Sequence, residues 1–249
     1  MALHIAILAD IHGNLEAFRA CLEDARARGA DRIVLLGDLV GYGADPEAVL
    51  EIAMAEVAGG ALALLGNHDA AAATGATSGM NEAAAAAIAW TRARLDPAQR
   101  GFLAALPLTI EAEGCLFVHA DASAPARWRY VTDAEAARRS LAATDAQATI
   151  CGHVHRPALY SLAESEKITA FRPAAGVAVP LSRGRRWLAV MGAVGQPRDG
   201  NPAACYGLIE TGDMTLTWRR VPYDIGAAAG KIRAAGLPER LAERLFHGS

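Results

Sequence analysis

From Leu35 to Gly43 the sequence reads LLGDLVGYG, and the rest of the chain is organised around this stretch. An apolar run that ends in the carboxylate of Asp38 and then passes into glycines is typical of a buried strand followed by a turn. Short apolar runs alternate with amphipathic segments on both sides of it. The elements expected here are strands over residues 4–9, 32–36 and 61–65, and helices over residues 14–28 and 45–57. This alternation predicts parallel strands with right-handed crossovers.

The next part of the chain predicts more helices and a hairpin. The pattern indicates a loop over 70–80, helices over about 82–95 and 96–106, paired strands over 108–112 and 115–119, a helix to about 142 opened by a capping box at 132–135, and a strand over 148–151. We expect residues 70–106 to form a helical cap over a site. The whole chain, residues 1–249, is expected to form one domain.

From Arg156 onward, Pro and Gly separate a series of short strands, which favours antiparallel pairing. These strands are expected over 158–162, 174–179, 187–191, 204–210 and 214–221, with hairpin-like turns at 182–184 and 211–213. Residues 225–247 are weakly helical. The second half of the chain is therefore expected to complete a layered sandwich with the first.

Composition excludes several classes of protein. A chain of 249 residues, 53% hydrophobic and 20% charged, can bury roughly 70–75% of its unfolded surface. The formal charge of −3 makes a nucleic-acid partner unlikely, because the basic clusters at 183–186 and 219–220 are expected to be solvated. Uncharged runs such as 70–81 are too short for a membrane span, and no signal peptide is recognisable, so we expect a cytoplasmic protein without a membrane partner. The four scattered cysteines indicate buried free thiols.

Polar residues with metal-ligand chemistry follow the predicted strands. They are Asp10, His12, Asp38, Asn67, His119, His153 and His155. Ligands bind at the carboxyl ends of strands in α/β sheets, so these residues can meet there. The i, i+2 spacing within Asp10–His12 and within His153–His155 places both side chains of each pair on one side of an extended backbone. Each pair is therefore expected to share a centre.

The donor set favours a dinuclear metal site. Carboxylate, amide and imidazole donors without thiolate suit Mn²⁺, Fe, Zn²⁺ or Ni²⁺ better than a structural zinc or a calcium site. Seven donors are too many for one tetrahedral ion but fit two ions about 3.5–4 Å apart that share a carboxylate. Singly, a histidine at a strand end is more often a satisfied polar residue. Five of the seven histidines, the four among these donors and His68 beside Asn67, follow the predicted strands, and this joint pattern favours the metal site over coincidence.

The ordered motifs resemble those of calcineurin-like metallophosphoesterases. They read DIHGN at 10–14, GDLVGYG at 37–43, GNHD at 66–69, His119, and GHVH at 152–155, and GQPRDG at 195–200 is similar to a feature of a small prokaryotic branch. The resemblance implies a four-layer αββα sandwich of two mixed β-sheets flanked by helices. It also implies a dinuclear centre at one edge of the sandwich.

By motif position, the resemblance implies two ligand sets bridged by Asp38. One ion would take Asp10, His12, Asp38 and His155, and the other would take Asp38, Asn67, His119 and His153. His68 would be catalytic, facing the substrate to protonate the leaving oxygen or to stabilise charge on the phosphoryl group. An ordinary histidine pKa of ~6.5 suits this role. Whether Asp69 orients His68 is open, because neighbouring side chains often diverge.

Departures from the family pattern restrict the class of substrate that is expected. Gly41-Tyr42 replaces the Asp-Arg of protein-phosphatase members, so a Ser/Thr protein phosphatase is not expected. Weaker candidates for substrate contact are Tyr42 and Arg198, and also Arg127 with its neighbours Trp128 and Tyr130. A cation beside aromatic rings suits a nucleotide or an aromatic ester, although such clusters are more often core or interface.

The sequence predicts a metal-dependent phosphoesterase acting on a small-molecule phosphodiester or nucleotide-type ester by attack of a metal-bridging hydroxide. Two divalent ions are expected, with Mn²⁺ first and Fe, Ni²⁺ or Zn²⁺ as alternatives. The natural ester, the native metal and the oligomeric state stay open at this point. A phosphomonoesterase of small substrates is the main alternative. A non-catalytic scaffold, like the retromer subunit of this fold, is disfavoured because a scaffold does not need Asn67, His68 and the four ligand histidines together.

Overall fold

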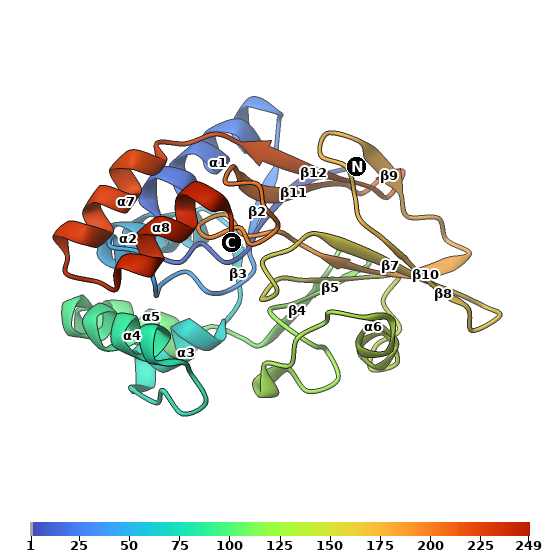
Figure 1. Cartoon of the computed structure of the whole chain (residues 1–249). Helices are drawn as coiled ribbons and strands as arrows, with labels where there is room; N and C mark the ends of the chain where they lie inside the picture. The colour runs from blue at the N-terminus through green and yellow to red at the C-terminus, as the bar shows by residue number, and fades with distance from the viewer. Residues whose placement is uncertain (1) are drawn as a thin grey trace.

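Two six-stranded mixed sheets face each other, and helices cover their outer faces (Figure 1). The computed structural model describes residues 2–249. The first sheet contains, in order, β3 (Leu62–Ala63), β2 (Arg32–Leu35), β1 (His4–Leu8), β11 (Ala204–Glu210), β12 (Thr215–Val221) and β9 (Ala178–Pro180). The second contains β4 (Thr109–Ala112), β5 (Cys115–Val118), β6 (Ala148–Cys151), β10 (Arg185–Val190), β7 (Ala158–Ala163) and β8 (Ile168–Phe171). The predicted αββα sandwich is confirmed.

Eight α-helices and one 3₁₀ turn surround the sheets in the described part of the chain. They are α1 (Leu15–Ala27), α2 (Pro46–Ala58), α3 (Asn67–Thr74), α4 (Glu82–Arg94), α5 (Pro97–Ala105), η1 (Pro125–Arg127), α6 (Ala134–Leu141), α7 (Ile225–Ala234) and α8 (Glu239–His247). The helices α1 and α2 pack on the first sheet and α6 packs on the second (Figure 1). The region proposed as a cap, 70–106, contains α4, α5 and most of α3, and its role as a cap stays a prediction.

Alternation along β1 explains why the sheets form layers. Ile5 and Ile7 belong to the core between the two sheets, whereas Ala6 and Leu8 pack toward α1 and α2. Successive side chains of a strand point to opposite faces, so a strand that is apolar at every position is buried on both sides. β1 pairs in parallel with β2, and β2 with β3, as the strand–helix rhythm predicts.

Several local predictions were wrong for identifiable reasons. The expected loop over 70–80 contains part of α3, because the run Ala70–Ala73 favours helix and Asp69 accepts the backbone N–H of Gly66 at the helix start. The N-cap of α6 is Asp133, whose carboxylate accepts the N–H of Ala136, instead of the expected capping box at Thr132. In both places an aspartate carboxylate accepts a backbone N–H at the start of the helix.

The antiparallel region after Arg156 also differs from the prediction. β10 pairs antiparallel with β7 on one side but parallel with β6 on the other. Residues 182–184 connect β9 in the first sheet to β10 in the second, so they do not form a hairpin. β8 was missed, and the strand expected over 174–179 is the shorter β9. The turn at 211–213 does join β11 to β12 as a hairpin, as predicted.

The C-terminal helices α7 and α8 form a pair that packs beside α1 and contacts the glycine-rich loop after β2 (Figure 1). Lys231 of α7 lies 2.5 Å from a carboxylate oxygen of Glu16 in α1 and 2.9 Å from one of Asp45. Leu241 and Leu245 of α8 share an apolar cluster with Tyr42. The end of the chain is thereby held against the loop that carries Asp38.

Two further expectations concern cysteines and membranes. All four cysteines are buried and free, as predicted. Among residues 2–249, none of the helices combines the length and the apolar character that crossing a bilayer requires.

A first prediction concerns Gly195, which lies against the turn after β1. Its N–H donates to the Asp10 carbonyl at 2.9 Å, and a Cβ placed on it would overlap the carbonyl oxygen of Ile11. We expect Gly195→Ala to destabilise the protein by at least about 2 kcal/mol, because neither backbone segment can move freely. For a chain of this size the melting temperature falls by roughly 4–8 °C, measurable by calorimetry.

Gly230→Ala is the matched control for this prediction. Gly230 is exposed in α7, and nothing lies within 4 Å of the position of an added Cβ. Alanine is the better helix former there, so the control is expected to gain about 0.5–1 kcal/mol. Equal melting temperatures for Gly195→Ala and the wild type would contradict the prediction, because they would show that the backbone at Gly195 or Ile11 can move without loss of stability.

Candidate metal centre

The site lies where the carboxyl ends of strands from both sheets meet. Asp10 and His12 follow β1, Asp38 follows β2, His119 follows β5, and His153 and His155 follow β6. The backbone N–H of His153 donates to both carboxylate oxygens of Asp10, at 3.1 and 3.0 Å, which ties the second sheet to the first. Asn67 was expected at a strand end, but it is the first residue of α3, four positions after β3 ends.

Most of the predicted ligands have left-handed backbone conformations. The φ angles are 55° at Asp10, 51° at His12, 53° at Asp38, 67° at His153 and 61° at His155. A residue with a side chain rarely adopts this region without a compensating reason, and such residues concentrate at functional sites. The extended backbone assumed for the i, i+2 pairs was therefore wrong, and the two histidines of the second pair separate into different groups.

The first group contains Asp10, His12 and His155, which are close enough to hold one ion. His155 Nε2 lies 3.4 Å from Asp10 Oδ1 and 3.1 Å from His12 Nε2. His12 Nε2 lies 3.6 Å from Asp38 Oδ2. All four residues are 2% exposed or less, so their donor atoms are shielded from bulk solvent.

The second group contains Asp38, His119 and His153, and Asn67 lies beside it. His119 Nε2 is 3.4 Å from Asp38 Oδ2, 3.2 Å from His153 Nδ1 and 3.3 Å from Asn67 Oδ1. Asp38 Oδ2 therefore faces both groups. Its other oxygen accepts the backbone N–H of His68 at 2.8 Å, which fixes the carboxylate in place.

Each of the four histidines has one ring nitrogen at a backbone carbonyl. Nδ1 of His12, His119 and His155 lies 3.2, 2.8 and 2.7 Å from the carbonyl oxygens of Val40, Leu36 and Gln196. Nε2 of His153 lies 2.9 Å from that of Trp128. A carbonyl oxygen only accepts, so these nitrogens carry the protons and the ring orientations are fixed.

This assignment leaves electron pairs facing one another inside the first group. The pKa values of His12 and His155 lie well below the usual range, chiefly because both are buried, so both rings are neutral at pH 7. Their unprotonated Nε2 atoms then point at each other across 3.1 Å and at the Asp10 carboxylate. Convergent acceptors without a donor are unfavourable alone and suit a divalent cation, so the residues present fit a metal ion.

The pKa values around Asp38 also indicate that the site favours a positive charge. Burial by itself raises the pKa of Asp38, but His119 and His68 outweigh it and hold that pKa well below its usual range. Burial lowers the pKa of His119, yet Asp38 outweighs it and raises the pKa to about 9. Burial raises the pKa of Asp10 to about 7. The second group thus favours a positive charge among its acceptors, which a metal ion also provides.

His68 lies at the edge of both groups. The ring is 4% exposed, its centroid is 4.8 Å from that of His12 and 4.4 Å from that of Tyr42, and its Nδ1 is buried without a hydrogen-bond partner in the described chain. It is also close enough to His12 and Asp38 to form a third set of potential ligands. A Cβ at position 41 would overlap His68 Nδ1, so the glycine that departs from the family pattern provides space for this ring.

Asp69 does not orient His68 through a hydrogen bond. One of its oxygens accepts the N–H groups of Leu39 and Val40 at 2.9 and 3.2 Å, and the other accepts that of Gly66 at 3.1 Å. The carboxylate therefore joins the loop after Asp38 to the start of α3. Its observed contacts position the backbone around Asp38 and Asn67.

The weaker candidates divide into two sides of the site. Tyr42 packs against His12 and His68, and the guanidinium carbon of Arg198 lies 5.7 Å from the centre of the Tyr42 ring. On the opposite side, Tyr130 stacks on His153 at 4.1 Å and 12° while remaining 53% exposed. Arg127 is exposed in the same loop, without a described hydrogen bond to the site residues.

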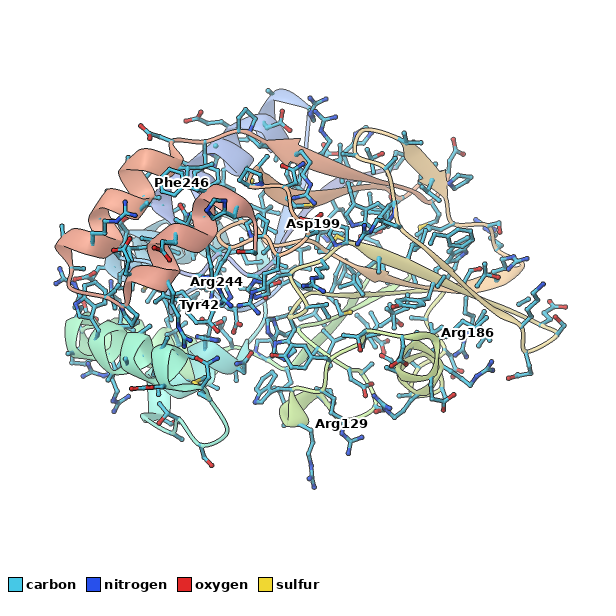
Figure 2. All side chains as sticks on the ribbon, in the orientation of Figure 1. Tyr42, Arg129, Arg186, Asp199, Arg244 and Phe246 are labelled. Atoms are coloured by element: carbon cyan, nitrogen blue, oxygen red, sulfur yellow. The ribbon has the colours of Figure 1, made fainter. Side chains whose placement is uncertain are left out.

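Sequence reasoning missed the backbone carbonyls that hold the imidazoles, and it also missed Arg244. The carbonyls of Leu36, Val40, Trp128 and Gln196 carry no side-chain signal. Arg244 lies in α8, and its charge contributes to the pKa of Tyr42, which is labelled near it in Figure 2. The sequence predicts a helix there, but the helix has two arginines, Arg240 and Arg244, and the pattern does not say which one faces the site.

Comparison with known proteins agrees with this geometry. The calcineurin-like phosphoesterase superfamily domain matches residues 3–214. An uncharacterised protein of Methanocaldococcus jannaschii is 34% identical over 249 residues, covering 98% of both chains. The crystal structure of a metallophosphoesterase from Sphaerobacter thermophilus is similar over 100% of both chains, with a TM-score of 0.88 and 35% identity. A hypothetical protein of Pyrococcus horikoshii shares the fold, with a TM-score of 0.78 and 19% identity over 99% of this chain and 98% of the other.

The chain therefore belongs to the calcineurin-like phosphoesterase superfamily. This confirms the family that the five ordered motifs indicate. Membership supports a metal-dependent hydrolase acting on phosphate esters, and the clustered histidines and aspartates supply donors suited to divalent ions.

Proposed function

We propose that this protein hydrolyses a phosphodiester or nucleotide-type phosphate ester at a dinuclear metal centre. The observation that carries the proposal is the position of Asp38, whose Oδ2 lies 3.6 Å from His12 Nε2 in one group of acceptors and 3.4 Å from His119 Nε2 in the other. Two divalent ions bound there would acidify a water molecule and neutralise phosphoryl oxygens.

The protein's own residues would hold this centre rigidly. Asp10, His12, Asp38 and His155 supply the donors on one side, and Asp38, Asn67, His119 and His153 supply those on the other. Because each imidazole is anchored to a backbone carbonyl, its free nitrogen is aimed before any ion binds. Mn²⁺ is the first candidate, with Fe, Ni²⁺ and Zn²⁺ as alternatives, since the donors are oxygen and imidazole nitrogen.

His68 is the proposed catalytic side chain. It lies beside Asp38 without itself hydrogen bonding to a carboxylate, and Tyr42 and His12 pack against its ring. From this position it can face an ester oxygen to protonate it or to stabilise its charge. Burial lowers its pKa, outweighing the opposite effect of Asp38, so stabilisation by the neutral ring is compatible with neutral pH.

A small substrate is favoured over nucleic acid. The two basic clusters are engaged locally, because Arg219 and Arg220 pair with Asp24 and Asp199, and Arg186 donates to the carbonyl of Leu141. Arginines that are engaged within the protein are less available to a phosphate backbone, which favours a small substrate. The phosphomonoesterase alternative uses the same centre, so substrate comparison has to decide between them.

The second prediction tests the function. Purified protein loaded with Mn²⁺ is expected to hydrolyse bis(p-nitrophenyl) phosphate, and removal of metal by a chelator is expected to abolish turnover, with recovery on adding Mn²⁺. Turnover is followed by the release of p-nitrophenolate, and the metal content per chain is measured in parallel, so that activity can be related to loading.

The outcomes separate the candidate functions. Faster turnover of p-nitrophenyl phosphate than of the diester would favour the phosphomonoesterase. Absence of turnover with Mn²⁺, Fe²⁺, Ni²⁺ and Zn²⁺ on panels of diesters and monoesters, at full metal loading, would leave the scaffold as the better account.

A further inference from the structure

Two arginines from distant parts of the chain lie beside Tyr42. Arg198 follows β10, and its backbone N–H donates to the carbonyl of His155 at 3.1 Å. Its Nη2 donates to Gln196 Oε1 at 2.8 Å, while its Nε is buried without a hydrogen-bond partner in the described chain. This guanidinium is therefore held in place but retains an unused donor.

Arg244 approaches from α8. Figure 2 labels it close to Tyr42 in that view, the charge of Arg244 contributes to the pKa of Tyr42, and the residue is half-buried. Leu241 and Leu245 of the same helix are buried against the cluster that contains Tyr42, so the helix face bearing Arg244 is fixed. The pKa of Arg244 is lowered, first by burial and then by the positive charge of Arg198.

The two guanidinium groups lack an acidic partner. No carboxylate oxygen in residues 2–249 lies within 4.0 Å of a side-chain nitrogen of either arginine. Elsewhere in the same half of the chain, Arg220 and Arg233 pair with Asp199 and Glu239. Two partly buried like charges without a counter-charge are unfavourable, and a bound anion would relieve both the repulsion and the unused donor.

The position of the pair relates it to the metal centre. The Tyr42 ring contacts the guanidinium group of Arg198 and also the rings of His12 and His68. An anion bound at these arginines would therefore lie close to the metal centre, since the backbone N–H of Arg198 also donates to His155. A phosphate suits this place, because guanidinium groups bind its oxygens through paired, charge-assisted hydrogen bonds.

We propose that Arg198 and Arg244 form a subsite for a second phosphate of the substrate, in addition to the phosphate that is hydrolysed. The inference rests on the proposed function and deepens it by naming the substrate class. The preferred ester then carries two phosphate groups, as a nucleoside diphosphate or a sugar bisphosphate does. Arg198 and Arg244 determine specificity by holding the group that does not react.

The third prediction is a difference in binding that does not require turnover. Methylphosphonate and the diphosphonates with one-carbon and three-carbon spacers are titrated calorimetrically into metal-loaded protein, and metal content is checked afterwards. We expect at least one diphosphonate to bind about tenfold or more tightly than methylphosphonate. Arg244→Gln is expected to remove this preference while changing methylphosphonate binding less than about twofold.

Arg233→Gln is the matched control. It removes the same charge from the same helical pair, but Arg233 is exposed and paired with Glu239. The control is expected to keep the preference for a diphosphonate. Chelation of metal by diphosphonates affects all three proteins alike, so it cannot produce a difference between Arg244→Gln and Arg233→Gln.

Several results would overturn the subsite. One is that the wild type binds the diphosphonates no more tightly than methylphosphonate. Another is that Arg244→Gln weakens the binding of methylphosphonate and of the diphosphonates equally. A third is that inorganic phosphate binds at Arg244 without changing the affinity for methylphosphonate or for the diphosphonates. The last result would indicate a separate ion site. Turnover of bis(p-nitrophenyl) phosphate is measured on the same samples. An intact diphosphonate preference in a protein without turnover would contradict the proposed function alone, and turnover without the preference would contradict the subsite alone.

Discussion

Asp38→Asn is expected to weaken both metal sites together, not one of them. Asparagine keeps the shape of the side chain, and its amide oxygen can still accept the backbone N–H of His68. It cannot keep the negative charge, and it presents an NH₂ donor to His12 and His119 where Asp38 Oδ2 now lies 3.6 and 3.4 Å from their Nε2 atoms. We expect metal affinity to fall by at least about 100-fold in both groups.

Elemental analysis after dialysis checks this prediction directly. The wild type is expected to keep two ions per chain and the variant fewer than one, with loss of turnover in proportion. Asp145→Asn, which removes an exposed carboxylate near the start of β6, is the control and is expected to keep both ions. Two tightly held ions in Asp38→Asn would refute the bridging role, and one retained ion would assign Asp38 to a single group.

The buried strands and the motif positions made much of this site predictable. Asp38 follows a continuous apolar run, and the same local signal places Asp10 and His12 after β1 and His119 after β5. A strand end fixes where the chain emerges, so a motif that follows it is located by local sequence. The strands β1, β2, β5 and β6 were all found within one or two residues of their predicted bounds.

The division of the ligands into two groups needed more than local sequence. His153 and His155 are two residues apart, yet they face different groups because both adopt left-handed backbone conformations. Their orientation depends on the carbonyls of Trp128 and Gln196, which come from other loops. Periodicity assumes a regular backbone and therefore fails at a turn that holds ligands.

The pairing of strands that are distant in the sequence was the other feature that the local sequence pattern did not predict. β10 completes the second sheet between β6 and β7, while its neighbour in sequence, β9, belongs to the first sheet. This crossover sends the chain past the site and places Arg198 beside His155. The approach of α8 to Tyr42 is similarly a result of tertiary packing. For this reason the sequence motifs did not predict that Arg244 lies near the site.

The neighbourhood of His68 indicates how the departure at Gly41-Tyr42 is accommodated. A carboxylate at position 41 would require a Cβ where His68 Nδ1 lies, and Gly41 itself has a φ of 88°. The space that a carboxylate partner would need is therefore occupied by the imidazole. Tyr42 packs on that ring at 4.4 Å between centroids and contributes to its position instead.

His68→Ala is expected to abolish most activity while leaving both ions in place. Removing a general acid or a group that stabilises charge commonly costs about 10²–10⁴-fold in kcat, and the substitution leaves the backbone N–H that donates to Asp38. Metal content measured with turnover distinguishes this role from ligation, since His68 is also close enough to His12 and Asp38 to bind an ion. His247→Ala, at an exposed histidine of α8, is the control and should match the wild type in both measurements.

The leaving group separates the two catalytic roles proposed for His68. If the side chain donates a proton to the leaving oxygen, His68→Ala should lose far more activity on esters of alkyl alcohols than on esters of p-nitrophenol, because nitrophenolate departs without protonation. If it stabilises charge on the phosphoryl group, both kinds of ester should lose activity equally. Loss of one ion from His68→Ala would contradict both roles and make His68 a ligand, whereas full activity with both ions retained would remove it from the mechanism.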